Sequence, residues 1–130
     1  MKALPVILAV DHNHRNLELL GQFLGREGYQ TRTAATLEEF DEVLAAADDI
    51  GMALVDIMGF DRTIWQRCEE LRRHKIPFVV LSPRHTAALQ QESLTHGAHG
   101  VLVKPLVVKE LLGIVRSLLD EDVGGEEENR

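Results

Sequence analysis

The chain has 130 residues and a mass of 14.6 kDa, a length typical of one domain. Hydrophobic residues make up 45% and charged residues 27%, which excludes a disordered or collagen-like protein. No apolar run is long enough to cross a bilayer and no signal-peptide pattern is present, so we expect a cytoplasmic protein without membrane contact. The single cysteine, Cys68, excludes an internal disulfide framework and a cysteine-based zinc cluster.

The net charge of −7 is unevenly distributed along the chain. Residues 120–130 hold six acidic residues and one basic residue, whereas the other 119 residues hold 15 acidic and 13 basic residues. We therefore expect one domain over residues 1–119, followed by an acidic tail or truncated linker over 120–130. The domain has no basic stripe with interleaved aromatic residues, which argues against nucleic-acid binding by this domain.

Short apolar segments alternate with longer amphipathic ones along the domain. Five segments are typical of strands, the second being more polar and suited to a sheet edge: 4–10, 29–33, 52–57, 77–81 and 101–103. Between and after them, apolar residues recur at helical spacing in series that begin at Leu17, Leu37, Ile64 and Val108, and a less periodic helix is expected over 85–96. Thr36 and Glu39 fit a capping box at one helix start.

This order of elements predicts an α/β fold. Continuous apolar strands need cover on both faces, which helices on either side of a parallel sheet provide. With right-handed crossovers, the best fit is a flavodoxin-like, doubly wound (βα)5 sandwich with a five-stranded parallel sheet in the order 2-1-3-4-5.

Four polar residues stand where the buried strands of this sheet are expected to end. Asp11 follows the first strand, Asp56 interrupts the third, Ser82 follows the fourth and Lys104 follows the fifth. Ligands of open parallel sheets bind beyond the carboxyl ends of the strands. Two carboxylates, a hydroxyl and an ammonium at one edge can hold a divalent cation and a phosphoryl group carried by one carboxylate.

The segments around these residues resemble the receiver domain of two-component response regulators. The resemblance extends over about residues 5–119 and rests on the ordered set of motifs ILAVD at 7–11, LVDIM at 54–58, VVLS at 79–82 and GAHGVLVKP at 97–105. It implies that Asp56 is the phosphoacceptor, taking a phosphoryl group from a histidine kinase, a phosphotransfer protein or a small phosphodonor. It also implies that Asp11, Asp56 and the backbone carbonyl of Met58 bind Mg²⁺.

The same resemblance assigns the switch. Ser82 is expected to contact the phosphoryl oxygens and to move inward when they arrive, while Lys104 pairs with the phosphoryl group. The Lys104–Pro105 peptide bond is expected to be cis. Val101 stands where receivers commonly carry an aromatic ring that swings inward, and valine is too stiff at χ1 to reproduce that movement. The segment 85–99 would then have to carry the signal by shifting as a whole.

His12 departs from the receiver pattern, because it stands where a second acidic metal ligand is expected. Mg²⁺ prefers oxygen ligands, so one interpretation is weakened or lost metal-dependent phosphorylation, or a preference for Mn²⁺. The other interpretation is a tolerated substitution in a site that works at higher metal concentration. His12 is therefore a doubtful metal ligand.

The loop after Asp56 is a second departure, since residues 57–61 lack the usual proline and are about two residues short. Asp61 could replace the missing carboxylate, but capping of the next helix is the favoured interpretation. Trp65, Phe60 and Cys68 are expected to pack that helix against the core. His96 and His99 are expected to interact with a helix end rather than with a metal.

The leading hypothesis is a signalling module rather than an enzyme. Its partners would be a histidine kinase or phosphotransfer protein upstream and an effector domain or protein downstream, with a homodimer possible through helix 4, strand 5 and helix 5. The alternative is a pseudo-receiver that acts by protein interaction or dimerisation without phosphorylation. His12, the short loop and Val101 favour this alternative, whereas the acidic residues, Ser82 and Lys104 oppose it. No glycine-rich phosphate loop supports a nucleotide-binding enzyme.

Overall fold

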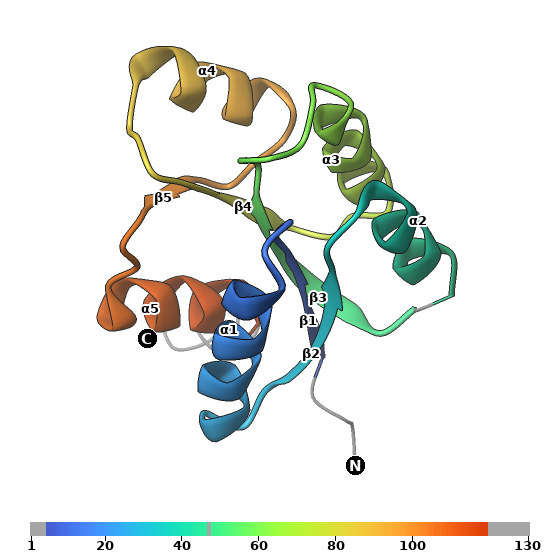
Figure 1. The fold of residues 1–130 in the computed structure, drawn as a ribbon, viewed down its shortest axis with the longest axis vertical. Coiled ribbons are helices and arrows are strands. Elements are labelled where there is room, and N and C mark those ends of the chain that lie inside the picture. Colours follow the sequence, from blue (N-terminus) through green and yellow to red (C-terminus); the bar gives the residue numbers. More distant parts are fainter. Residues whose placement is uncertain (1–4, 47, 120–130) are drawn as a thin grey trace, which may run out of the picture.

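The computed structural model describes residues 5–46 and 48–119. One parallel sheet runs through the middle of the molecule in the order β2-β1-β3-β4-β5 (Figure 1). Its strands are β1 (Val6–Val10), β2 (Gln30–Ala34), β3 (Ile50–Asp56), β4 (Phe78–Ser82) and β5 (Val101–Val103). The predicted fold class and strand order are confirmed, and the expected strands differ from the observed ones by at most two residues at each end.

Five helices connect and follow the strands: α1 (His14–Arg26), α2 (Leu37–Ala46), α3 (Ile64–Arg73), α4 (Ala87–Thr95) and α5 (Val108–Leu119). Helices α1 and α5 lie on one face of the sheet, and α2, α3 and α4 lie on the other (Figure 1). None of the helices in the described part of the chain is long and apolar enough to span a membrane. The acidic tail expected over 120–130 lies outside the described residues.

The two helical layers are possible because the central strands are apolar on both sides. Along β3, Met52 and Leu54 pack with α1 and α5, whereas Ala53 and Val55 pack with α2 and α3. This alternation is the period of two that a strand imposes on its side chains. The polar strand β2 forms an edge of the sheet, as its sequence predicts.

Three helices begin at side chains that accept hydrogen bonds from free backbone N–H groups. Asn13 caps α1 by accepting from the N–H of Asn16, and Thr86 caps α4 by accepting from that of Leu89. At α2, Thr36 Oγ1 accepts from Glu39 N at 3.0 Å. The Glu39 carboxylate reaches back to the N–H of Ala35 at 2.7 Å, one residue earlier than in the standard capping box.

Helix α4 is attached to the rest of the molecule differently from the other helices. Ser93 is its one fully buried residue among those described, and Leu94 is 47% exposed. Helices α1 and α5, by contrast, each bury two large apolar side chains in the core. The weak apolar periodicity of residues 85–96 therefore reflects a helix that lies at the surface with little apolar anchoring.

Candidate functional site

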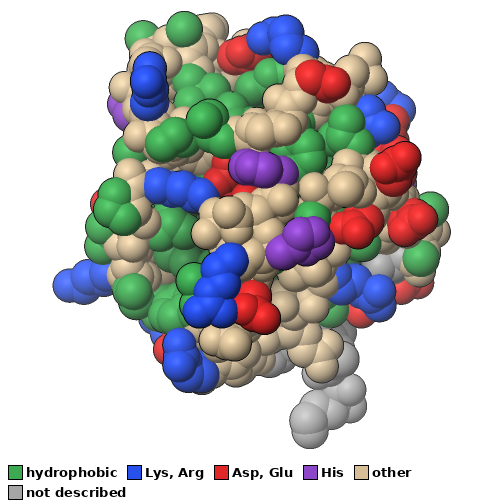
Figure 2. Space-filling view, in the orientation of Figure 1, with side chains coloured by type: hydrophobic (Ala, Val, Ile, Leu, Met, Phe, Trp, Pro, Cys, Tyr) green, Lys and Arg blue, Asp and Glu red, His purple; other side chains and the backbone are tan. Residues whose placement is uncertain are grey.

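The carboxyl edge of the sheet gathers the four polar residues predicted from the sequence. Asp56 and Ser82 end β3 and β4, while Asp11 and Lys104 directly follow β1 and β5. Asp11, Asp56 and Ser82 are each at most 6% exposed, although they lie at loop entrances. Near the centre of the face shown in Figure 2, acidic, basic and histidine side chains lie next to one another among hydrophobic ones.

Lys104 links the two buried carboxylates of this edge. Its ammonium forms an ion pair with Asp56 Oδ2 and lies 3.5 Å from Asp11 Oδ2. Burial alone lowers the pKa of Lys104, but the hydrogen bond and charge of Asp56, helped by Asp11, outweigh it and raise this pKa above its usual value. The lysine therefore remains cationic over the whole neutral range and offsets negative charge at the edge.

Asp11 is held by the loop between β1 and α1. Its Oδ1 accepts from the backbone N–H of Asn13 at 2.9 Å, and its Oδ2 accepts from the side-chain amide of Asn16 at 3.1 Å. Asn13 also caps α1, so the start of that helix fixes the position of the carboxylate.

Asp56 is held by the loop that follows it. Its Oδ1 accepts from the backbone N–H of Met58 at 2.9 Å, so the carboxylate and the peptide of residue 58 are positioned together. The Met58 side chain points outward and is 52% exposed. This loop makes one further turn contact, from Phe60 N to the carbonyl of Ile57 at 3.4 Å.

Ser82 and Val101 belong to the neighbouring strands. The Ser82 hydroxyl accepts from Arg84 N at 3.1 Å, and the Ser82 carbonyl accepts from Lys104 N at 2.8 Å, which ties the ends of β4 and β5 together. The Lys104–Pro105 peptide bond is cis, as predicted. Val101 is half-buried and pairs with Val80 across the sheet.

The oxygen atoms at this edge suit a hard divalent cation. The Asp56 carboxylate stands next to the backbone of Met58 and shares Lys104 with the Asp11 carboxylate. Mg²⁺ is commonly bound by one or two carboxylates with water completing its octahedron. In the described part of the chain, no three His, Cys, Asp or Glu side chains converge closely enough to hold a metal by themselves. The donor set therefore fits Mg²⁺ with few protein ligands, and the structure gives no support to His12 or Asp61 as a third side-chain ligand.

Asp61 lies instead at the start of α3. Its Oδ1 accepts from the N–H of Thr63 at 2.9 Å and also contacts the Thr63 hydroxyl. The hydrogen bonds from Thr63 lower the pKa of the Asp61 carboxyl. Helix α3 begins at Ile64 with Thr63 as its N-cap, and no side chain caps it by a hydrogen bond. The expected capping by Asp61 is therefore wrong in detail, because its carboxylate holds the turn that precedes the helix.

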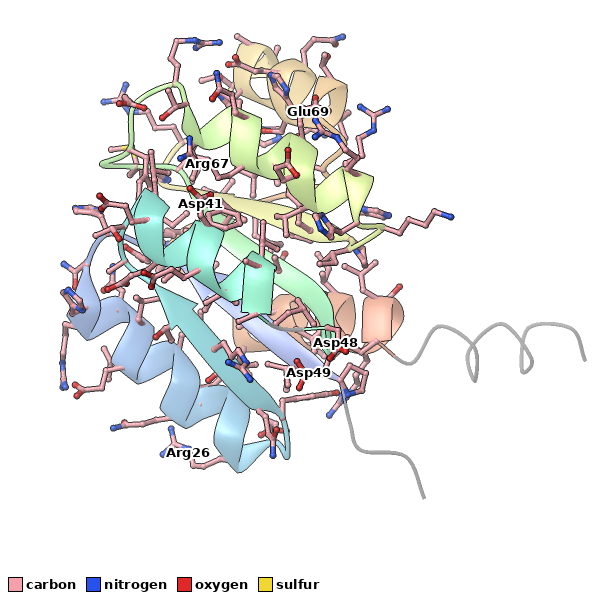
Figure 3. The ribbon with its side chains drawn as sticks, turned by 90° about the vertical axis from the view of Figure 1, so that its right-hand side faces the viewer. Arg26, Asp41, Asp48, Asp49, Arg67 and Glu69 are labelled. Carbon is pink, nitrogen blue, oxygen red and sulfur yellow. The ribbon has the colours of Figure 1, made fainter. Side chains whose placement is uncertain are left out.

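A second cluster, which sequence reasoning missed, joins α3 to α4. The Trp65 ring packs against His96, whose Nδ1 faces the Glu69 carboxylate, and Arg62 pairs with Glu92. Figure 3 shows Glu69 on α3 where that helix runs beside α4, and Asp41 and Arg67 facing each other between α2 and α3. The partners of this cluster are about 30 residues apart in sequence, so no local pattern reveals their pairing.

Known proteins resemble this chain over most of its length. The response regulator receiver domain family matches residues 7–116. The transcriptional regulatory protein GltR of Pseudomonas aeruginosa is 30% identical over 117 residues, which cover 87% of this chain and 48% of GltR. The chain thus spans about half the length of the curated relatives it matches.

Solved structures show the same fold. A CheY-like receiver domain protein from Methanospirillum hungatei superimposes with a TM-score of 0.83 at 26% identity, covering 95% of this chain and 99% of that one. A response regulator from Burkholderia pseudomallei, solved with a phosphorylated aspartic acid, a calcium ion and citrate, gives a TM-score of 0.76 at 23% identity and covers 95% of this chain and 72% of that one.

Receiver domains bind a divalent cation for phosphorylation and interact with histidine kinases or phosphotransfer proteins, and the oxygen-rich edge described above is consistent with that chemistry. With the family matched over residues 7–116 and the strand order in agreement, the chain belongs to the response regulator receiver domains, signalling modules of two-component systems that work through phosphoaspartate.

Proposed function

We propose that Asp56 accepts the phosphoryl group in this receiver domain. The observation that carries the proposal is the Lys104 ammonium lying between the buried carboxylates of Asp56 and Asp11. A half-buried lysine beside two buried carboxylates has the charge needed to stabilise added phosphoryl oxygens. This arrangement favours phosphorylation over a module that acts through surface contacts alone.

The reaction proposed is a phosphoryl transfer to a carboxylate. An Asp56 oxygen forms a bond to phosphorus while the bond from phosphorus to the donor breaks, and the donor's leaving group keeps the electron pair. The second Asp56 oxygen retains its N–H partner at Met58 or its Lys104 partner during the reaction. The product is an acyl phosphate carrying about −1.5 to −2 charges, which Lys104 and the bound cation offset.

The cation in this proposal is Mg²⁺, held by Asp11, Asp56 and the Met58 carbonyl, and it supplies charge stabilisation to the phosphoryl oxygens. His12 occupies the position of a second acidic ligand, so we infer a weaker Mg²⁺ affinity and a site that also accepts Mn²⁺. His12→Asp is expected to raise Mg²⁺ affinity roughly tenfold or more, because even outer partners of metal sites change affinity by that factor. Titration calorimetry of His12→Asp against His12→Asn, which adds no charge, measures this effect.

Signal output is assigned to Ser82, Val101 and α4. Ser82 would contact the phosphoryl group, and since Val101 has no ring to swing inward, the segment 85–99 would shift as a unit.

The partners would be a histidine kinase or phosphotransfer protein upstream and an effector downstream, with a homodimer through α4, β5 and α5. The exposed side chains of Leu94, Val103 and Val108 support this last surface. Residues 1–119 would form the receiver and 120–130 an acidic tail or linker.

The test is incubation with acetyl phosphate in Mg²⁺ and then in Mn²⁺, followed by intact mass measurement. The proposal expects a mass gain of one phosphoryl group that is absent in Asp56→Asn. It also expects the gain to persist in Asp48→Asn, because Asp48 is exposed and lies near the opposite edge of the sheet (Figure 3). No gain with either ion would favour the pseudo-receiver that acts by protein interaction.

A further inference from the structure

The His12 ring lies directly against Gly59 of the loop that follows Asp56. A Cβ atom at residue 59 would fall 2.6 Å from Cγ and 2.7 Å from Cε1 of the imidazole. These distances are far below van der Waals contact, so residue 59 has to be glycine while the ring stays in place. Gly59 also has φ +86, which by itself favours glycine.

The ring makes a second contact with the same loop. His12 and Phe60 meet edge to face, with ring centroids 6.4 Å apart and planes inclined by 83°. Toward the carboxylates, by contrast, His12 Nδ1 comes no closer to Asp11 Oδ1 than 3.7 Å, beyond hydrogen-bond distance. The imidazole therefore lies against Gly59 and the Phe60 ring and makes no hydrogen bond to the Asp11 carboxylate.

Packing of Ile57 and Phe60 against the core fixes both sides of the loop, whereas few contacts fix the residues between them. The loop backbone is held by the Met58 N–H on Asp56 and by the long turn contact from Phe60 to Ile57. The ring of His12 covers Gly59, which lies between the two residues that donate these hydrogen bonds. A contact at Gly59 thus acts on the peptide that presents the Met58 carbonyl.

We propose that His12 is a positioning residue that holds the 57–61 loop by ring packing, and that it is not a metal ligand. This inference rests on the proposed function in one respect, that the loop held by His12 supplies a carbonyl to the cation. The chain has thus replaced a ligand at position 12 by a side chain that orders a neighbouring ligand. A planar ring is sufficient for this role, and its nitrogen atoms are not needed.

The test compares His12→Phe with His12→Ala in the full chain without metal or phosphodonor. Amide hydrogen exchange of Met58 and Phe60 is the readout, because it reports the order of the loop directly. We expect exchange in His12→Ala to be faster by roughly two- to ten-fold, the range of an aromatic pair contact, and exchange in His12→Phe to stay near wild type. Equal exchange in wild type and His12→Ala would overturn the proposal.

Metal binding distinguishes a positioning residue from a ligand. By calorimetry with Mg²⁺ and Mn²⁺, His12→Phe should keep wild-type affinity and His12→Ala should lose affinity by a similar two- to ten-fold factor. Loss of affinity in His12→Phe as large as in His12→Ala would show that the imidazole nitrogen binds the ion. Exchange rates are measured without metal, so absent phosphorylation would contradict the proposed function while leaving this inference testable.

Gly59→Ala provides a second variant that does not remove the ring. We expect Gly59→Ala to accelerate exchange at Met58, because its methyl group would collide with the His12 ring. Combining it with His12→Ala should remove most of this acceleration, because the methyl group then has space. Gly28→Ala is the matched control, since Gly28 has φ +94 but no atom within 4 Å of an added Cβ. Equal changes of Met58 exchange in Gly59→Ala and Gly28→Ala would show that His12 does not hold the loop. Additive effects of Gly59→Ala and His12→Ala on this exchange would show the same.

Discussion

The imidazole of His96 lies flat on the indole of Trp65, with ring centroids 4.9 Å apart and planes inclined by 15°. His96 is the C-cap of α4, and Trp65 is in the first turn of α3. The same imidazole places Nδ1 2.9 Å from Glu69 Oε2, while Arg72 donates to the carbonyl of Thr95 at 3.3 Å. These contacts from α3 to the end of α4 fix a helix that has little apolar anchoring.

His96→Ala is expected to lower the free energy of unfolding by about 1 kcal/mol, mostly from the lost ring contact, because partly exposed ion pairs contribute less. Acrylamide quenching of Trp65, the single tryptophan, should increase because one face of its indole loses cover. His99→Ala is the control, since that side chain is exposed on the next loop. Equal quenching in the two variants would mean that the stack does not hold α4 in solution.

Ser93→Ala is expected to stabilise the protein. Ser93 is fully buried and, among the described residues, its hydroxyl has no hydrogen-bond partner. Removing an unpaired buried hydroxyl, which turns the hydroxymethyl group into a methyl group, should raise the free energy of unfolding by about 1 kcal/mol, with a few tenths more from helix propensity. Ser117→Ala on the exposed side of α5 measures the propensity term alone. Urea unfolding measures both variants. An equal gain in the free energy of unfolding for Ser93→Ala and Ser117→Ala would contradict an unpaired Ser93 hydroxyl.

Lys104→Met is expected to change how stability depends on pH. The pKa of Lys104 is raised in the folded protein, so its pairing with Asp56 and Asp11 contributes stability that is complete below the ordinary value of 10.5. This contribution is lost as the pH rises through the folded pKa. Wild type should therefore exceed the variant at neutral pH, and the difference should shrink above pH 10.5. Urea unfolding of both proteins across this range gives the comparison; a constant difference would show that the ammonium is not responsible.

Cys68 is expected to be inert in the folded protein. The side chain is 0% exposed, and burial raises the pKa of its thiol to about 12, with a smaller contribution from Glu69. The reactive thiolate is therefore scarce at neutral pH, and iodoacetamide should label the native protein far more slowly than the unfolded protein. Because the folded state holds this proton more tightly, stability should also fall between pH 9.0 and about 12. Labelling at equal rates with and without urea would refute the burial.

Much of the fold was accessible from the sequence because a parallel sheet has a simple pattern. Strands covered on both faces must be continuously apolar, so β1, β3 and β4 stand out without any partner information. Their polar ends then fall at one edge as a consequence of topology, which brings Asp11, Asp56 and Lys104 into contact. The functional roles of these residues, and that of Ser82, remain predictions.

The contacts that the sequence did not reveal are tertiary and join residues without a shared pattern. Nothing near His12 indicates that its ring covers Gly59, and nothing near His96 indicates that it stacks on Trp65. His96 was expected to interact with a helix end, and its position as C-cap of α4 agrees with that, but its two partners on α3 were not foreseen. Helix α4 has almost no apolar period because its fully buried side chain is a serine and Leu89 is the one leucine of the helix that packs against the core, as far as the described residues show.

The way α4 is attached separates the position of this helix from the stability of the whole domain. Its attachment consists of a stacked ring, ion pairs, a buried serine and one partly buried leucine, Leu89, so it buries less hydrocarbon than the other helices do. If α4 carries the signal as proposed above, substitutions at these contacts would shift this helix between its positions while the sheet and the other four helices keep the domain folded.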